Sequence, residues 1–145
     1  MSIFGALDVS ATGMTAQQVR SDIISQNIAN VNTTRDAKGN PYKRKMVVFE
    51  EKSFPTFEES LSFATGHTGK GVKVTEIAED PSDGRMVYDP SHPDADENGY
   101  VTYPNVNTVT EMTNLIDATR AYEANVTVLN STKGMALKAL DISGA

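Results

Sequence analysis

The chain has 145 residues, enough for one ordinary domain, and it carries a formal net charge of -6 at pH 7. This negative charge argues against nucleic acid as a partner, because phosphates require a basic protein face. Apolar residues make up 39% of the chain and Trp is absent, so a large self-contained core is not assured. The lack of Cys excludes disulfides and thiolate chemistry.

The start of the chain lacks the pattern of a cleavable secretory signal, since no Lys or Arg precedes Arg20. The longest plainly apolar run, from Met46 to Phe49, is far too short to cross a bilayer. We therefore expect a soluble chain with no direct membrane span. This composition fits the cytosol, and it also fits export by a route that cleaves no signal.

A first helix is predicted over residues 4–30. Its seam residues recur in steps of three and four, although the middle of the seam is polar. Gly13 inside it costs about 1 kcal/mol relative to Ala. Apolar side chains also lie on other sides of this helix, which indicates more than one neighbour. The seam consists of Leu7, Ala11, Met14, Gln18, Ser21, Ser25 and Ile28.

The middle of the chain reads as a β-rich insertion. Gly, Pro and Asn-Gly turn signals separate short strand-like runs at 45–49, 72–77, 85–88 and 100–103. The stretch 54–70 is rich in small residues and is predicted to be a mobile loop. Asn98-Gly99 predicts a tight turn before the last strand.

A second, longer helix is predicted over residues 109–142, with a length of about 50 Å at about 1.5 Å per residue. Thr108 and Glu111 match a T-x-x-E capping box at its start. A heptad seam of about four repeats runs along it. The seam consists of Met112, Leu115, Thr119, Tyr122, Val126, Leu129, Lys133, Ala136 and Leu140.

These elements predict an α+β fold in which long N- and C-terminal helices form a coiled-coil-like layer around a small β-rich insertion. The expected segments are 1–34, 35–106 and 107–145. A two-helix hairpin inside one molecule is an alternative, but two helices alone make a thin core. Packing between molecules better explains apolar residues on several helix faces.

A calcium loop is a weak candidate for the stretch that begins at Pro93. Asp94, Asp96 and Asn98 occupy the first, third and fifth positions of an EF-hand loop. Asn105 stands where that loop requires a bidentate Glu, and Pro residues upstream exclude the flanking helix. We therefore expect no metal and no cofactor.

No constellation of residues indicates catalysis. His67 and His92 have no second His at metal-ligand spacing, and no nucleophile or phosphate-binding motif is present. The acidic pairs in the loops are typical of solvated turns, so the chain is not expected to be an enzyme.

Amide side chains cluster on both predicted helices. By default an Asn caps a helix or faces water, but a buried amide between helices fixes their register at some cost in stability. The residues concerned are Asn27, Asn30, Asn32, Asn114, Asn125 and Asn130.

Residues 27–33, NIANVNT, resemble the N-terminal signature shared by flagellar rod and hook proteins. The segments TTR at 33–35, PYKRK at 41–45 and VVFE at 47–50 are similar to basal-body rod proteins of that family. The most specific match is YDPSHPDADENGYVTYPNVN at 88–107, followed by EM at 111–112 and RAYEAN at 120–125. The resemblance covers essentially the whole chain, from Leu7 to Ile142.

The resemblance implies a structural subunit that polymerises with related rod proteins and with copies of itself into the proximal drive shaft of the bacterial flagellum, where it transmits torque. It implies uncleaved export through the flagellar type III apparatus and assembly beyond the inner membrane, in the periplasmic rod. The membrane-ring base is a further candidate partner. A calcium-binding module and a coiled-coil adaptor are the alternative functions.

The expected assembly interface is made of helix residues that need partners outside the chain, so the terminal helices are expected to be partly disordered in the free chain. These residues are Leu7, Met14, Asn27, Ile28, Asn30, Met112, Leu115, Tyr122, Asn125, Val126, Leu129 and Leu140.

Overall fold

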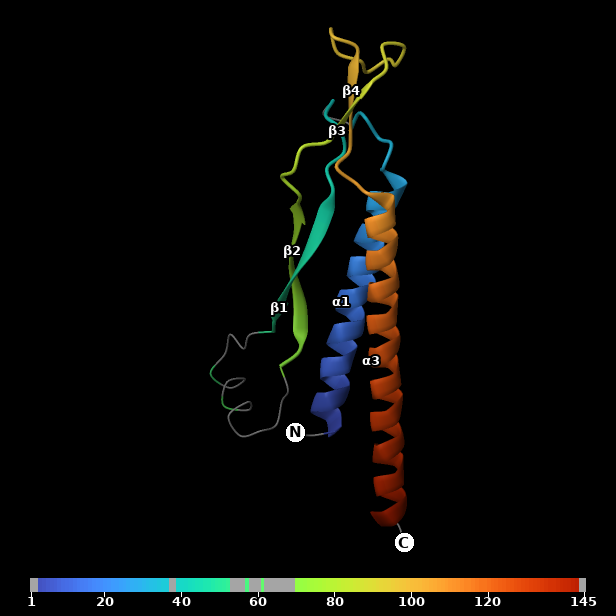
Figure 1. Ribbon diagram of the computed structural model, residues 1–145. Helices are drawn as coiled ribbons and strands as arrows, with labels where there is room; N and C mark the ends of the chain where they lie inside the picture. Colours follow the sequence, from blue (N-terminus) through green and yellow to red (C-terminus); the bar gives the residue numbers. More distant parts are fainter. Residues whose placement is uncertain (1–2, 37–38, 53–56, 58–60, 62–69, 144–145) are drawn as a thin grey trace. The chain divides into compact units, whose positions relative to one another are not determined.

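The computed structural model describes residues 3–36, 39–52, 57, 61 and 70–143. Most of the predicted mobile loop at 54–70 lies outside these residues. The elements follow the order α1 (Ile3–Ala29), β1 (Lys45–Glu51), β2 (Val72–Glu79), β3 (Arg85–Tyr88), β4 (Tyr100–Tyr103) and α3 (Thr108–Ser143) (Figure 1). The predicted α+β fold is confirmed: two long terminal helices pack together, with β-hairpins inserted between them.

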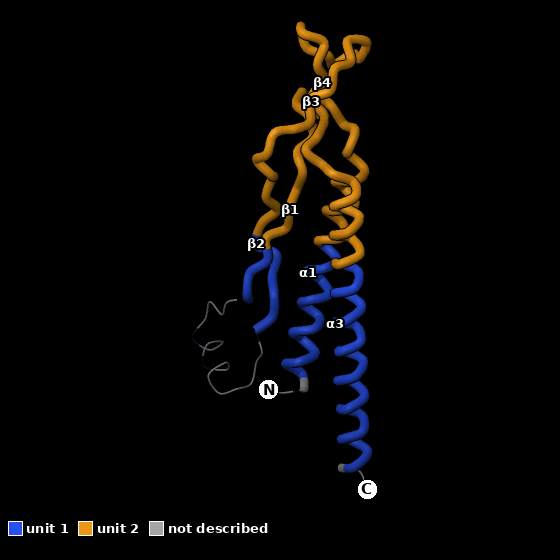
Figure 2. The backbone as a smooth tube through the Cα atoms, viewed as in Figure 1, with its two compact units in different colours: residues 1–19, 49–75, 118–145 blue, residues 20–48, 76–117 orange. Residues whose placement is uncertain are grey.

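The chain divides into two compact units (Figure 2). Unit 1 contains Met1–Val19, Phe49–Thr75 and Ala118–Ala145, and unit 2 contains Arg20–Val48 and Glu76–Asp117. Both units therefore receive part of α1, part of α3 and part of the pairing between β1 and β2. At about 1.5 Å per residue, the 36 residues of α3 extend for about 54 Å.

In unit 1, α1 is in close contact with α3 and with the start of β2. A Cβ at Gly13 of α1 would lie 3.0 Å from Oδ1 of Asn125 on α3, so the missing side chain makes room for this amide. On the strand side, the Val72 N–H donates to Oγ1 of Thr12 at 3.2 Å. Gly71 has no room for a Cβ because Thr12 lies against it.

In unit 2, β3 and β4 form an antiparallel pair with Tyr88 opposite Tyr100 and Val87 opposite Val101. Val101 is fully buried, so the face that carries the valines points inward. The other pair, β1 and β2, is bonded in this unit by the Asp80 N–H, which donates to the Arg44 carbonyl at 2.8 Å.

Two turns of unit 2 share one hydrogen-bond pattern, the first closed by Asp36 and the second by Asp96. In the second, the Gly99 N–H donates to the Asp96 carbonyl at 3.0 Å, and the Tyr100 N–H donates to the Asp96 carboxylate at 2.8 Å. Asn40 and Gly39 make the equivalent bonds to Asp36. Both glycines have positive φ, 87° and 79°, which L side chains rarely adopt.

The predicted capping box at the start of α3 is wrong. Oδ1 of Asn107 accepts hydrogen bonds from the N–H groups of Val109 at 3.0 Å and Thr110 at 3.2 Å, so Asn107 is the N-cap. The Glu111 carboxylate does not turn back to the helix start, because it is buried among other partners described below. The segment 107–111 offers two possible caps, the Asn107 side chain and the Thr108/Glu111 box. The Asn107 side chain is the one that caps the helix.

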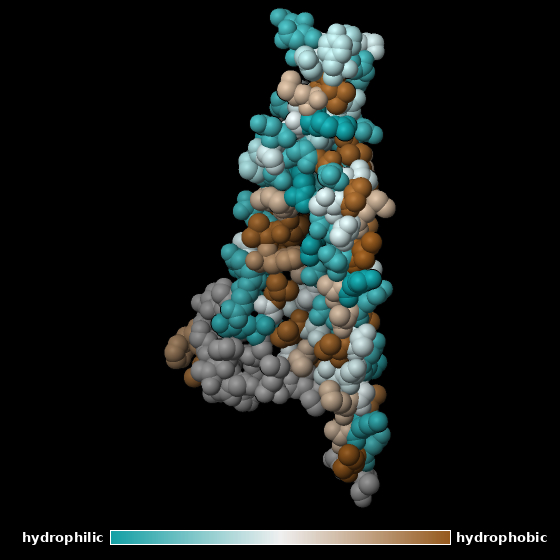
Figure 3. Space-filling model, viewed as in Figure 1, coloured by the Kyte–Doolittle hydropathy of each residue, from teal (hydrophilic) through white to brown (hydrophobic). Residues whose placement is uncertain are grey.

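None of the helices in the described part of the chain has both the length and the apolar character that a membrane span requires. Exposed apolar side chains nevertheless occur along α3, interspersed with hydrophilic ones (Figure 3).

A pair of glycine substitutions tests whether α1 packs on α3 in the isolated chain. A Cβ at Gly134 on α3 would meet nothing within 4 Å. We expect Gly134→Ala to stabilise the helix by about 1 kcal/mol, because Ala has the higher helix propensity. Gly13→Ala should gain less, since its methyl group meets Asn125. Circular dichroism during thermal unfolding measures both variants; equal gains would indicate that the two helices are apart in the free chain.

Candidate functional site

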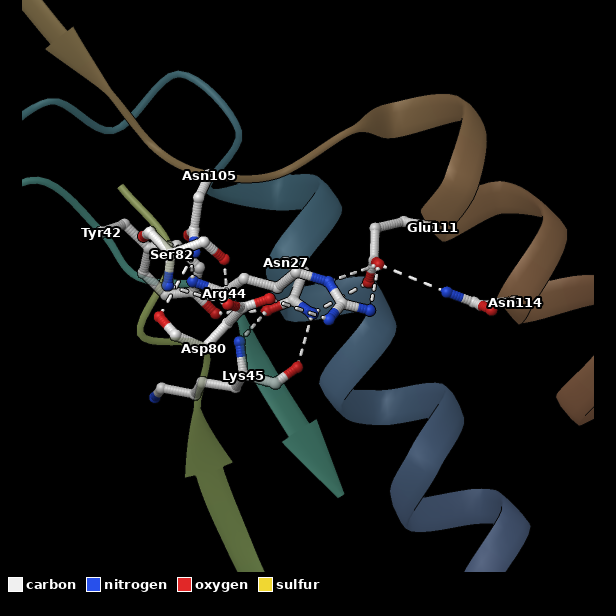
Figure 4. A network of polar contacts seen from close by, with 9 residues as sticks. All are labelled: Asn27, Tyr42, Arg44, Lys45, Asp80, Ser82, Asn105, Glu111 and Asn114. Carbon is white, nitrogen blue, oxygen red and sulfur yellow. Dashed lines mark hydrogen bonds and ion pairs between the residues drawn. The ribbon is translucent and has the colours of Figure 1, made fainter. Parts of the chain in front are cut away.

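A buried amide at the end of α1 is the centre of a polar network in unit 2 (Figure 4). The Asn27 side chain has no exposed surface. Its Nδ2 donates to the Lys45 carbonyl and to Oε2 of Glu111, both at 2.9 Å. Its Oδ1 accepts from the Lys45 N–H at 2.9 Å and from the Tyr42 hydroxyl at 2.8 Å. Asn27 thus uses both of its donors and both of its acceptor sites.

The Glu111 side chain, in the first turn of α3, is also fully buried. Its Oε1 accepts from Nε of Arg44 and lies 2.9 Å from a second guanidinium nitrogen of the same residue. Asn114 adds a longer contact of 3.4 Å to Oε1. A buried carboxylate is stable only with charge compensation and hydrogen bonds, and Arg44 with Asn27 supplies both.

Arg44 and Asn105 extend the network to the strands. The third guanidinium nitrogen of Arg44 lies 3.4 Å from the Asp80 carboxylate, and the Arg44 N–H donates to Oδ1 of Asn105 at 2.8 Å. Nδ2 of Asn105 donates to the carbonyls of Asp80 at 3.3 Å and Ser82 at 3.1 Å. Hydrogen bonds from the Ser82 side chain and N–H, followed by Arg44, hold the pKa of Asp80 below its ordinary value.

The network joins α1, the insertion and α3 within one unit. A buried polar group restricts the arrangements in which its partners can pack, because any other register leaves it unpaired. Asn27, Arg44 and Glu111 come from three separate segments, so these segments must adopt one relative register to satisfy all of them. The network is suited to a structural role, because its charged side chains, Arg44, Asp80 and Glu111, already pair with one another.

Sequence reasoning found only part of this network. Asn27 was singled out as an amide able to fix register, and its burial and bonds agree with that interpretation. The sequence pattern predicts a capping role for Glu111 and gives no role to Arg44 beyond its place in the PYKRK segment. No local signal separates a capping Glu from a buried one; only the pairing with Arg44, 67 residues away in sequence, distinguishes them.

Two of the three candidate calcium ligands, Asp94 and Asp96, accept hydrogen bonds from the chain itself. Asp94 accepts a hydrogen bond from the Thr34 hydroxyl at 2.8 Å and lies 3.5 Å from the Arg35 guanidinium. Asp96 is used by the N–H groups of Asn98 and Tyr100. Within the described residues, no group of three or more His, Cys, Asp or Glu side chains is arranged to hold a metal.

The predicted interface residues differ in exposure. Met112, Tyr122 and Leu140 are exposed, and Asn27 is buried. The remaining eight are half-buried: Leu7, Met14, Ile28, Asn30, Leu115, Asn125, Val126 and Leu129. The most buried positions of α3 include Glu111, Ala118 and Thr132, each of which precedes a predicted seam residue, Met112, Thr119 or Lys133, by one position.

A short apolar stripe is left exposed on α3 in unit 2. Val109, Met112 and Ile116 follow one another at intervals of three and four residues, and each is more than half exposed. Residues at this spacing lie on one side of a helix. In unit 1, the exposed apolar residues of α3 are Tyr122, Val128, Met135, Leu137, Leu140 and Ile142.

Comparison with known protein families finds a flagellar rod family at each end of the chain. The family described as "Flagella basal body rod protein" matches residues 7–35, and the one described as "Flagellar basal body rod FlgEFG protein C-terminal" matches residues 97–142.

Full-length relatives are also found. The chain is 50% identical to "Flagellar basal-body rod protein FlgC" of Bacillus subtilis (strain 168) over 148 residues, which covers 98% of this chain and 99% of the relative. The protein of that name in Borreliella burgdorferi is 44% identical, with 98% of both chains covered. The one in Salmonella typhimurium (strain LT2) is 37% identical, again with 98% coverage of both.

The two-helix fold and these matches define a structural subunit of the flagellar basal-body rod. More narrowly, the chain belongs to the FlgC family of flagellar basal-body rod proteins. It is therefore a non-enzymatic component of the rod, and membership implies assembly with other rod subunits. The adaptor and calcium-binding alternatives do not account for similarity over the whole chain.

Removal of the Glu111 carboxylate tests the network. Glu111→Ala would leave Arg44 and Asn27 without their buried partner, and we expect unfolding to become easier by about 3–5 kcal/mol. Asp117→Ala is the matched control, because it removes an exposed carboxylate from the same helix and should change the free energy of unfolding by less than about 0.5 kcal/mol. Urea denaturation measures both; equal effects would contradict a stabilising network.

The Tyr42 hydroxyl gives a pH test. Burial, and then the charges of Glu111 and Glu79, raise the pKa of Tyr42 above its ordinary value of 10.0. The neutral phenol therefore stabilises the fold below pH 10.0, and this contribution is lost as the pH rises through the folded pKa. In an ultraviolet titration of tyrosinate, Tyr42→Phe should remove a late-ionising component. Tyr88→Phe controls for the loss of one phenol, and an identical change in both curves would refute the assignment.

Proposed function

We propose that this chain polymerises with related rod proteins and with copies of itself through its two terminal helices, and that the resulting proximal rod acts as the drive shaft that transmits torque. Membership of the FlgC family supports the rod role. The helices support the route of assembly, because their surfaces keep apolar side chains that the single chain does not cover.

The stripe formed by Val109, Met112 and Ile116 is the observation that carries this proposal. Full burial of one such side chain contributes about 1.5–3 kcal/mol. Since these three are already partly covered, a neighbour that buried the stripe would gain less than the full value for each. The same contact repeated in every subunit still gives a large total, which suits an assembly under load.

The twelve candidate interface residues keep different roles in this proposal. Met112, Tyr122 and Leu140 are exposed and available for direct contact. Asn27 already has four hydrogen bonds inside unit 2, so we assign it to holding the end of α1 in place rather than to touching a partner. The eight half-buried residues would contact a neighbouring subunit through the part of each side chain that remains exposed.

The finer location and partners also belong to this proposal. We infer that the chain leaves the cytoplasm uncleaved through the flagellar type III export apparatus and joins the rod beyond the inner membrane, in the periplasm. The membrane-ring base remains a candidate partner at the lower end of such a shaft.

Polar substitutions in the stripe test the proposal. Met112→Gln combined with Ile116→Gln should leave the isolated chain folded as before, because both side chains are exposed there. The loss of apolar contacts, about 1–3 kcal/mol for each subunit, should reduce swimming in soft agar and lower the amount of the chain in purified basal bodies.

Asp117→Gln is the matched control, since it places the same residue at an exposed position of the same helix. It should restore swimming when it complements a strain that lacks the gene. A double variant that swims and assembles like the unmodified chain would show that the stripe does not serve assembly.

A further inference from the structure

The β3–β4 hairpin has an inward face and an outward face. Val87 and Val101 are opposite each other on the inward face, where Val101 is fully buried. Met86, Tyr88 and Tyr100 project from the outward face and are 62%, 64% and 42% exposed. Two tyrosines and a methionine on one solvent-facing strand pair form an apolar surface larger than isolated exposed residues would give. We refer to these three residues as the outward face.

The two tyrosine rings are held in place before any partner arrives. Their centroids lie 5.3 Å apart in an edge-to-face arrangement, and their residues are directly paired in the hairpin register. Gly99 contributes as well, because a Cβ there would lie 3.0 Å from Cε2 of Tyr88. Large aromatic side chains that are already ordered lose little conformational entropy on binding, which makes them effective interface residues.

Three acidic residues flank this face in the sequence. Asp89 follows Tyr88, and Asp96 and Glu97 lie in the turn that ends at Tyr100. None of these three forms an ion pair with a Lys or Arg in the described part of the chain. The sequence contains no Lys or Arg from Met86 to Thr119. Hydrogen bonds from the Ser91 side chain and N–H lower the pKa of Asp89, so its charge persists at neutral pH.

Two basic residues of unit 2 that contact the hairpin or its loop, Arg85 and Arg35, already have partners within the chain. Arg85, at the base of β3, lies over the Tyr103 ring with 5.6 Å between the guanidinium carbon and the ring centroid. Tyr103 and Arg85 are register partners, so both belong to the inward set of side chains. Arg35 lies 3.5 Å from Asp94.

We propose that the outward face of the β3–β4 hairpin docks onto a positively charged surface of a neighbouring rod subunit. This inference rests on the proposed function, and it adds the chemistry of one contact away from the helices. Lys or Arg side chains would pair with Asp89, Asp96 and Glu97 and would lie over the exposed tyrosine rings, which attract cations. Tyr, Met and Arg are enriched in such interfaces.

A lipid surface is a poorer occupant for the same site. Tyrosine is common at membrane interfaces, but peripheral attachment to anionic lipids requires basic residues beside the aromatic ones. Here the residues beside the tyrosines are acidic, so anionic headgroups would be repelled.

Photo-cross-linking in assembled basal bodies tests the contact directly. A photoreactive phenylalanine analogue replaces Tyr88 in the full chain, and motile cells are irradiated before the basal bodies are purified. We expect a covalent product with a rod subunit, either a related protein or a second copy, identified by mass spectrometry. A product with lipid alone, or no product from basal bodies that contain the chain, would overturn the proposal.

Charge reversal tests the chemistry of the partner. Glu97→Lys, made in the cross-linking chain, should lower the yield of the product about tenfold, because it opposes the partner's positive charge. Glu76→Lys makes the same charge change at an exposed residue of β2 in the same unit and should leave the yield unchanged. Equal yields in both variants would reject a basic partner.

These outcomes are separable from the assembly proposal. The amount of chain in the basal bodies reports on assembly through the helices, whereas the cross-link reports on the outward face. Basal bodies that contain the full amount of chain but give no product at position 88 would defeat the hairpin contact and leave the helix-mediated assembly intact.

Discussion

The Glu111 carboxylate determines how unit 2 can fold. A negative charge with no exposed surface must have a positive partner and hydrogen bonds, and Arg44 and Asn27 supply them, with a longer contact from Asn114. Arg44 lies just before β1, Asn27 lies near the end of α1, and Glu111 lies in the first turn of α3. The start of α3 therefore reaches a stable position only when the other two segments are already beside it.

The exposed apolar residues of α3 differ from the polar network in where their partners come from. The polar network is satisfied inside one chain, whereas Val109, Met112 and Ile116 remain more than half exposed in the chain that carries them. In the proposed assembly, specificity within the subunit and attraction between subunits would thus depend on different residues of the same helix. This division suits a chain that must hold one shape while it polymerises.

Much of the fold was predictable because its signals are local. The helix α3, the strands β3 and β4 and the glycine turn at Gly99 depend on heptad spacing, alternation and turn chemistry that a short window contains. The site was harder. Asn27 could be suspected as a buried amide, but the role of Glu111 depends on a residue far away in sequence, and the choice of Asn107 as the N-cap depends on which side chain the fold buries. The family resemblance carried the function, since composition and spacing alone left a calcium loop and an adaptor open.

The repeated turn chemistry at Asp36 and Asp96 has a consequence for the order of folding. Each turn closes through bonds between residues only three or four positions apart, and the β3–β4 hairpin adds pairings across the loop from Asp89 to Gly99. Such low contact order permits formation in about 1–10 μs, before any distant segment is needed. This hairpin can therefore form from its own local sequence, whereas the bond between Glu111 and Asn27 must wait until 84 residues of separation have been closed.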